Sequence, residues 1–262
     1  MQSLTSDRAI SNWRNGREYA GLESNPTLTT SAFERRHRVL AYGTYTLPWW
    51  KKKGATDVTL YYEGTSGFPI DYVAQSGDLN GDGFNGNDLI YIPKSATDPN
   101  EIKIGSQAAN GTFTQDVAAA QAFDKFISDN PCLNEQRGTI MKRNSCRTPW
   151  QNRMDLSVRQ SLPQYRGQAM TIQLDIVNFA NALGEVLQHV DGHEREWGKI
   201  YTPTISSAFP QQAVLQQTAR TPGPLNQSMP VFNFNTNVRN RGAFSNISNL
   251  GYQMALTFRY EF

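Results

Sequence analysis

Five segments of the chain alternate between apolar and polar residues, and this period of two constrains the fold more than any other feature. The last segment reads LGYQMALTFRYEF, with a large apolar residue at every second position from Leu250 to the terminal Phe262. Such alternation marks strands with one apolar face. The five segments are 36–47, 57–66, 151–162, 168–179 and 249–262. Most of them exceed the ~5–6 residues typical of strands in globular proteins.

Long alternating strands with charges on the polar face favour an all-β fold, the C-terminal part of an antiparallel transmembrane β-barrel. The connections also alternate in length: 48–55 and 163–168 are short, whereas 66–150 and 180–248 are very long. Outer-membrane barrels have short periplasmic turns and longer extracellular loops. We therefore expect the short turns and the C-terminus in the periplasm. Residues 1–35 and the two long connections are then expected outside the cell.

One short helix is expected inside the 66–150 loop. The stretch TQDVAAAQAFDKFISDNP (114–131) is rich in helix formers, offers Thr114 as an N-cap and stops at Pro131. Val117, Ala120, Phe123 and Ile127 would share one face of this helix.

Composition and motifs exclude several function classes. The net charge is only +2 and no basic stripe is interleaved with aromatic residues, so a nucleic-acid partner is not expected. No apolar run approaches the ~18 residues of a transmembrane helix. Nucleophile-elbow, P-loop and dinucleotide-binding motifs are all missing from the sequence, and we therefore expect no enzymatic activity.

The segment DLNGDGFNGNDLIYIP (78–93) resembles a calcium loop in its spacing. Oxygen-bearing side chains at alternate positions followed by glycine are how such loops wrap a hard cation. The twelfth position, normally a bidentate carboxylate, is Leu89 here, and no flanking helix pair is expected. An Asx-rich turn cluster that caps its own backbone is an equal alternative. The candidate calcium ligands are Asp78, Asn80, Asp82, Asn85 and Asp88.

Two cysteines, Cys132 and Cys146, lie in one polar segment of the same loop. A disulfide between them requires an oxidising compartment, and the alternative is a pair of free thiols in a cytosolic protein. Because the strand pattern favours an exported barrel, we expect the disulfide.

Several segments together resemble the C-terminal end of TonB-dependent outer-membrane receptors of the type with an N-terminal carboxypeptidase-regulatory-like domain. The resemblance covers roughly residues 36–200 and 246–262. It rests on RRHRVLAYGTYTLPW, DLNGDGFNGNDLIYIP, CLNEQRGTIMKRNSCRTPWQNRMDLSVRQ, TIQLDIVNFANALGEV followed by EWGKI, and the closing LGYQMALTFRYEF. In that family the closing strand is a β-signal, which implies that Tyr260 and Phe262 address the chain to the barrel-assembly machinery.

The resemblance implies active import of a nutrient across the bacterial outer membrane, powered by the TonB complex. The sequence contains about five of the family's strands but no plug, TonB box or regulatory domain. We therefore expect a fragment of a longer receptor. The expected partners are the rest of its own barrel and plug, the TonB complex, the assembly machinery, the lipid bilayer and an extracellular small-molecule, glycan or peptide ligand. Candidate ligand contacts are the loop aromatics Tyr91, Trp197 and Tyr201.

Two alternatives remain open. A passive porin or a surface adhesin could be built on a similar barrel, and the upstream coding sequence would distinguish either from an importer. A secreted β-sandwich that binds carbohydrate has the same strand alternation but would need no detergent for extraction.

Overall fold

The structure, a computed structural model, is mostly β and forms two compact units. The sheet unit comprises Arg35–Gly67, Trp150–Thr202 and Asn246–Phe262, and the mixed unit comprises Met1–Glu34, Phe68–Pro149 and Pro203–Ser245. The structure describes residues 2–3, 28–31, 34–49, 54–79, 85–86, 88–163, 167–193, 211–221, 228–236 and 251–262.

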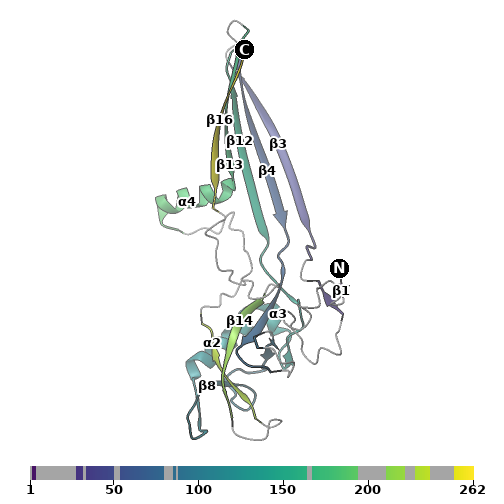
Figure 1. Ribbon diagram of the computed structural model, residues 1–262, viewed down its shortest axis with the longest axis vertical. Helices are drawn as coiled ribbons and strands as arrows, with labels where there is room; N and C mark the ends of the chain where they lie inside the picture. The colour runs from purple at the N-terminus through teal and green to yellow at the C-terminus, as the bar shows by residue number, and fades with distance from the viewer. Residues whose placement is uncertain are drawn as a thin grey trace. The chain divides into compact units, whose positions relative to one another are not determined.

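The sheet unit contains one antiparallel sheet of five strands, side by side in Figure 1 in the order β16–β13–β12–β4–β3. These strands confirm the five predicted from alternation, with ends shifted by a few residues. Among the described residues β3 and β16 do not pair with each other, so this sheet is open and these two strands form its edges. The strands are β3 (Arg38–Trp49), β4 (Gly54–Thr65), β12 (Gln151–Ser161), β13 (Ala169–Val177) and β16 (Gln253–Glu261).

The register aligns the apolar positions of neighbouring strands. Val158 lies opposite Val58 on one side and Leu174 on the other, and Leu174 in turn lies opposite Leu256. Because side chains alternate between the faces of a strand, all of these project to the same face. Much of this face is exposed in the described chain, including Leu256 at 75% and Phe258 at 59%.

The opposite face of the sheet is polar and internally bonded. The Asp175 carboxylate accepts hydrogen bonds from Ser157 Oγ at 2.6 Å and from Gln173 Nε2 at 2.9 Å. Further along the same face, Arg153 donates to Asp155 at 2.9 Å. Strands β12 and β13 therefore have one apolar and one polar face, as the alternation predicts, whereas β3 also places Leu40 and Tyr42 on the polar side.

A helix that the sequence analysis does not predict, α4 (Phe179–Asp191), follows β13 directly. The chain turns from strand to helix at Asn178, whose φ of 56° lies in the left-handed region that asparagine tolerates. Its N–H donates to Asp155 at 2.8 Å, which ties the start of the helix to the polar face of the sheet. Gly192, with φ 75°, ends the helix in a left-handed C-cap.

The mixed unit is built on a second sheet, in the order β11–β5–β14–β15–β8–β9, with β6 paired to β5. The β5–β14 and β15–β8 pairs are parallel and the other pairs antiparallel, so this sheet departs from the antiparallel fold predicted for the chain. Its strands are β5 (Pro69–Gln75), β6 (Asp88–Leu89), β8 (Lys103–Gln107), β9 (Phe113–Gln115), β11 (Cys146–Arg147), β14 (Gln211–Arg220) and β15 (Pro230–Phe234). Short pairs join β1 (Gln2–Ser3) to β2 (Thr29–Thr30) and β7 (Tyr91–Ile92) to β10 (Thr139–Ile140).

Helix α2 (Val117–Asp129) supplies the aromatic core of this unit. Its buried Phe123 and Phe126 contact Phe234 of β15 at ring-centroid distances of 5.2 and 5.8 Å. Tyr72 of β5 meets Phe126 edge-on at 5.4 Å. A short helix, α3 (Pro131–Asn134), follows with Pro131 in its first turn, where the missing N–H costs nothing.

The predictions for the long connections need correction. The described parts of 66–150 and 180–248 contain strands and three helices, α2, α3 and α4, instead of one helix in otherwise irregular loops. Thr114 is not the N-cap, because it lies in β9 and Asp116 caps the helix through a bond from the Ala119 N–H. Val117 does not share the buried face either, since it is 55% exposed while Phe126 takes its place. None of the helices in the described ranges has the length and hydrophobicity to cross a lipid bilayer.

Candidate ligand pocket

The mixed unit contains a cavity of about 350 Å³. Its volume lies at the lower end of the ~300–1,000 Å³ typical of sites for small ligands. Most of the lining is apolar, with a tyrosine, a serine and one charge of each sign among it. The lining residues are Ala74, Leu79, Leu89, Ile90, Tyr91, Glu101, Ile102, Ile140, Leu215, Arg220, Ser228, Met229, Pro230 and Phe232.

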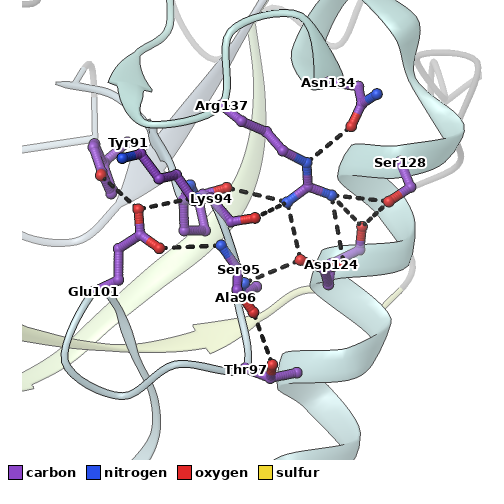
Figure 2. A network of polar contacts seen from close by, with 11 residues as sticks. Tyr91, Lys94, Ser95, Ala96, Thr97, Glu101, Asp124, Ser128, Asn134 and Arg137 are labelled. Atoms are coloured by element: carbon purple, nitrogen blue, oxygen red, sulfur yellow. Dashed lines mark hydrogen bonds and ion pairs between the residues drawn. The ribbon is translucent and has the colours of Figure 1, made fainter.

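Tyr91 and Glu101 form one polar wall of the pocket. The Tyr91 hydroxyl donates to Glu101 Oε1 at 2.8 Å. The same carboxylate accepts from the Lys94 N–H at 2.8 Å and the Ser95 N–H at 3.0 Å. Both oxygens of Glu101 are thus bonded within the protein, and its main role is to hold the turn that follows Tyr91 (Figure 2).

The environment of this wall shifts both pKa values. Burial alone would raise the pKa of Glu101, but the hydrogen bonds from Lys94, Ser95 and Tyr91 and the charge of Lys94 outweigh burial and bring this pKa below the ordinary 4.5. Burial, the hydrogen bond to Glu101 and the charge of that carboxylate raise the pKa of Tyr91. At neutral pH the wall therefore presents an ionised carboxylate bonded to a protonated phenol.

Arg137 fixes the same turn from the other side, as Figure 2 shows. Its Nη1 donates to the carbonyls of Pro93 at 3.1 Å and Lys94 at 3.0 Å, and to Asp124 Oδ1 at 3.0 Å. Asp124 also accepts from the Ala96 N–H at 3.0 Å. The turn 93–97 is therefore held by two ionised clusters, which keep the Tyr91 wall of the pocket in place.

Arg220, at the end of β14, is the positive group of the pocket lining. Its Nη2 donates to the Asp78 carbonyl at 3.1 Å. Among the described residues this is one bond from a guanidinium that has five N–H donors. Arg137, in contrast, donates hydrogen bonds to several side chains and backbone carbonyls of the unit.

We expect Glu101→Gln to lower the free energy of unfolding by about 1–2 kcal/mol at pH 7, because charge-assisted bonds to three donors are weakened. A carboxyl group whose pKa is lower in the folded state stabilises the folded protein at pH values above its unfolded-state pKa. This stabilisation is lost as the pH falls through the folded-state pKa. The difference between wild type and variant should therefore narrow as pH falls below 4.5. Urea unfolding of wild type and variant at a series of pH values from 7 to below 4.5 measures this difference. The exposed Glu135→Gln is the control, and an equal effect of both substitutions would contradict the role given to Glu101.

Of the ligand contacts predicted from sequence, Tyr91 lines the pocket, whereas Trp197 and Tyr201 lie outside the described residues. Sequence reasoning missed Arg220 and Glu101. Neither belongs to a recognisable motif, and both line the same pocket only because strands remote in sequence pair in the mixed unit.

The structure places the described calcium candidates in different settings. Asp88 is buried in β6 and its Oδ2 accepts from the Leu79 N–H at 2.8 Å, a bond of the kind that the Asx-turn alternative predicts. Asn85 is exposed, and Asn80 and Asp82 lie outside the described residues. Within the described ranges, no cluster of three or more acidic, histidine or cysteine residues could hold a metal. The calcium site stays a prediction.

Cys132 and Cys146 are joined by a disulfide, with their Cα atoms 5.4 Å apart. The bond connects α3 to β11, the edge strand of the mixed sheet. Tyr260 and Phe262 lie at the end of β16 with their ring centroids 6.1 Å apart, and Phe262 is fully exposed.

Comparison of the chain with models of known protein families, with curated proteins and with solved structures gives no match.

Proposed function

We propose that the chain is the C-terminal barrel portion of a TonB-dependent outer-membrane receptor. In this proposal the sheet unit supplies part of the barrel wall and the C-terminal assembly signal, and the mixed unit carries a ligand pocket outside the cell. The receptor would import an extracellular nutrient with energy from the TonB complex.

The observation that carries the proposal is the exposed apolar face of the five-stranded sheet. Large apolar residues from all of its strands line up across this face, and several on β3, β13 and β16 are exposed. Apolar surface in water costs about 25 cal/mol per Å², and soluble monomers rarely expose apolar patches beyond a few hundred Å². A face of lipid-contacting residues backed by a polar, hydrogen-bonded face is the pattern of a barrel wall.

The register supports a common direction for the connections. Ser161 pairs with Ala55 and Ala169 pairs with Glu261, so the two short turns and the C-terminus lie at one end of the sheet. The long connections leave from the other end. In the proposal the first end is periplasmic, and β3 and β16 pair with further strands of the same receptor. A disulfide in the mixed unit agrees with an extracellular location.

The test compares two neighbouring residues of β16. Leu256 pairs with Leu174 on the apolar face, and Thr257 pairs with Gln173 on the polar face. If the apolar face contacts lipid, Leu256→Arg should weaken association with phospholipid vesicles by roughly 2–4 kcal/mol, whereas Thr257→Arg should have little effect. Flotation of the purified chain with vesicles measures both.

A secreted β-sandwich would stay in solution without detergent, and neither substitution would change its flotation. That result would overturn the proposal. A porin or an adhesin would pass the flotation test, because each shares the lipid-facing wall. A plug and a TonB box in the coding sequence upstream of Met1 would distinguish the importer from both.

A further inference from the structure

We infer that the pocket of the mixed unit binds a small amphipathic carboxylate, with the anionic group at Arg220 and the apolar body against the aliphatic lining. The inference rests on the proposed role of this pocket as a ligand site and adds the chemical class of the ligand.

The pocket lining carries two charged groups, Glu101 and Arg220. Glu101 accepts three hydrogen bonds from the protein, from Tyr91, Lys94 and Ser95. A carboxylate that is satisfied in this way gains little from a cationic ligand, which would have to displace bonds already made. The negative group is therefore a structural part of the wall.

Arg220 is placed differently. It is partly buried at the end of β14, and its guanidinium donates to Asp78 through Nη2. The fork of a guanidinium matches the two oxygens of a carboxylate, and such charge-assisted pairs are stronger than neutral hydrogen bonds. An anionic group on the ligand is thus favoured over a neutral or cationic one.

The remaining lining sets the other half of the ligand. Leu89 from β6, Ile140 from β10 and Phe232 from β15 contribute apolar side chains from three different strands. A cavity of about 350 Å³ bounded in this way accepts a short aliphatic or aromatic body and excludes a polar glycan, whose hydroxyl groups would lose their bonds to water. A free short-chain acid and the apolar C-terminal residue of a peptide share this chemistry.

The experiment measures binding of four probes to the full chain by isothermal titration calorimetry. N-acetyl-leucine is compared with its neutral amide, and octanoate with the tripeptide Ala-Ala-Leu carrying a free carboxyl terminus. We expect the acid to bind about 10- to 100-fold more tightly than the amide, the range of one charge-assisted pair. Binding of octanoate alone identifies a free acid as the source, and binding of the tripeptide alone identifies a peptide terminus.

Substitutions test the assignment to Arg220. Arg220→Gln should remove the preference for the acid, while Arg220→Lys should restore part of it and Lys142→Gln, which removes one exposed charge elsewhere in the same unit, should preserve it. Ile140→Trp narrows the pocket but keeps Arg220, and it should lower the affinity for all four probes. Circular dichroism checks that each variant folds.

Equal affinity for acid and amide, or no binding of any probe to a folded chain, overturns the inference. Neither result bears on vesicle flotation, so failure of the ligand class is distinguishable from failure of the barrel proposal.

Discussion

Arg137→Ala should lower the free energy of unfolding of the mixed unit by about 1–3 kcal/mol, the range for leaving partly buried hydrogen-bonding groups without their partner. The Arg137 side chain is only 19% exposed, and it bonds Asp124, Ser128 and Asn134 in addition to two backbone carbonyls. Truncation leaves the Asp124 carboxylate and the carbonyls of Pro93 and Lys94 without these donors. Urea unfolding of the chain measures the loss.

The control for this substitution lies on α2, next to Asp124, the partner of Arg137. Lys125 pairs with Asp129 one turn away, but its side chain is 75% exposed. Surface pairs of this kind contribute about 0.3–0.5 kcal/mol, so Lys125→Ala should be nearly neutral. Arg137→Lys keeps the charge without the planar fork and should give an intermediate loss. If Arg137→Ala and Lys125→Ala lowered the free energy of unfolding equally, the bonds from Arg137 to turn 93–97 would not be a major source of stability.

The sheet unit was accessible from sequence because its strands are amphipathic. Met154, Leu156 and Val158 alternate with charged or polar residues, and this period survives in the sequence whatever the strand pairs with. The order of the strands follows as well, since each antiparallel neighbour is also the next amphipathic segment along the chain. The short turns specify the β3–β4 and β12–β13 pairs, and consecutive strands are usually neighbours in a sheet even across the two long connections.

The mixed unit was not accessible in the same way. Strand β5 is buried at six of its seven positions, so PIDYVAQ shows no alternation. Several other strands of the unit have only two or three residues. The parallel pairing of Tyr72 with Gln212 joins segments far apart in sequence, which no local pattern specifies. The pocket depends on this pairing, and so its lining could not be assembled from motifs.

The sequence does not predict helix α4 for a different reason. Helical spacing is present at Leu183, Val186, Leu187 and Val190. The alternation of the preceding strand runs on to Phe179, however, and predicts a loop after it. The break at Asn178 depends on one residue in the left-handed region. Asparagine adopts this conformation more readily than most residues, but its presence does not require it.

Phe123→Ala should cost the mixed unit about 3–5 kcal/mol, the range for removing a large buried aromatic side chain. Phe123 is fully buried, and its ring contacts Phe234 at 5.2 Å and Phe126 at 6.5 Å. The substitution therefore opens a cavity between α2 and β15. Val117→Ala, six residues earlier on the same helix and 55% exposed, should change stability by less than about 0.5 kcal/mol.

Hydrogen exchange read by mass spectrometry separates a local from a global effect of Phe123→Ala. Because α2 and β15 belong to the mixed unit, faster exchange is expected in peptides that cover 117–129 and 230–234. Peptides of β12 and β13 belong to the sheet unit, which has its own strand pairing, and should keep their wild-type rates. Equal acceleration in both sets would mean that the two units unfold as one, and that the Phe123 core supports the proposed barrel wall as well as the pocket.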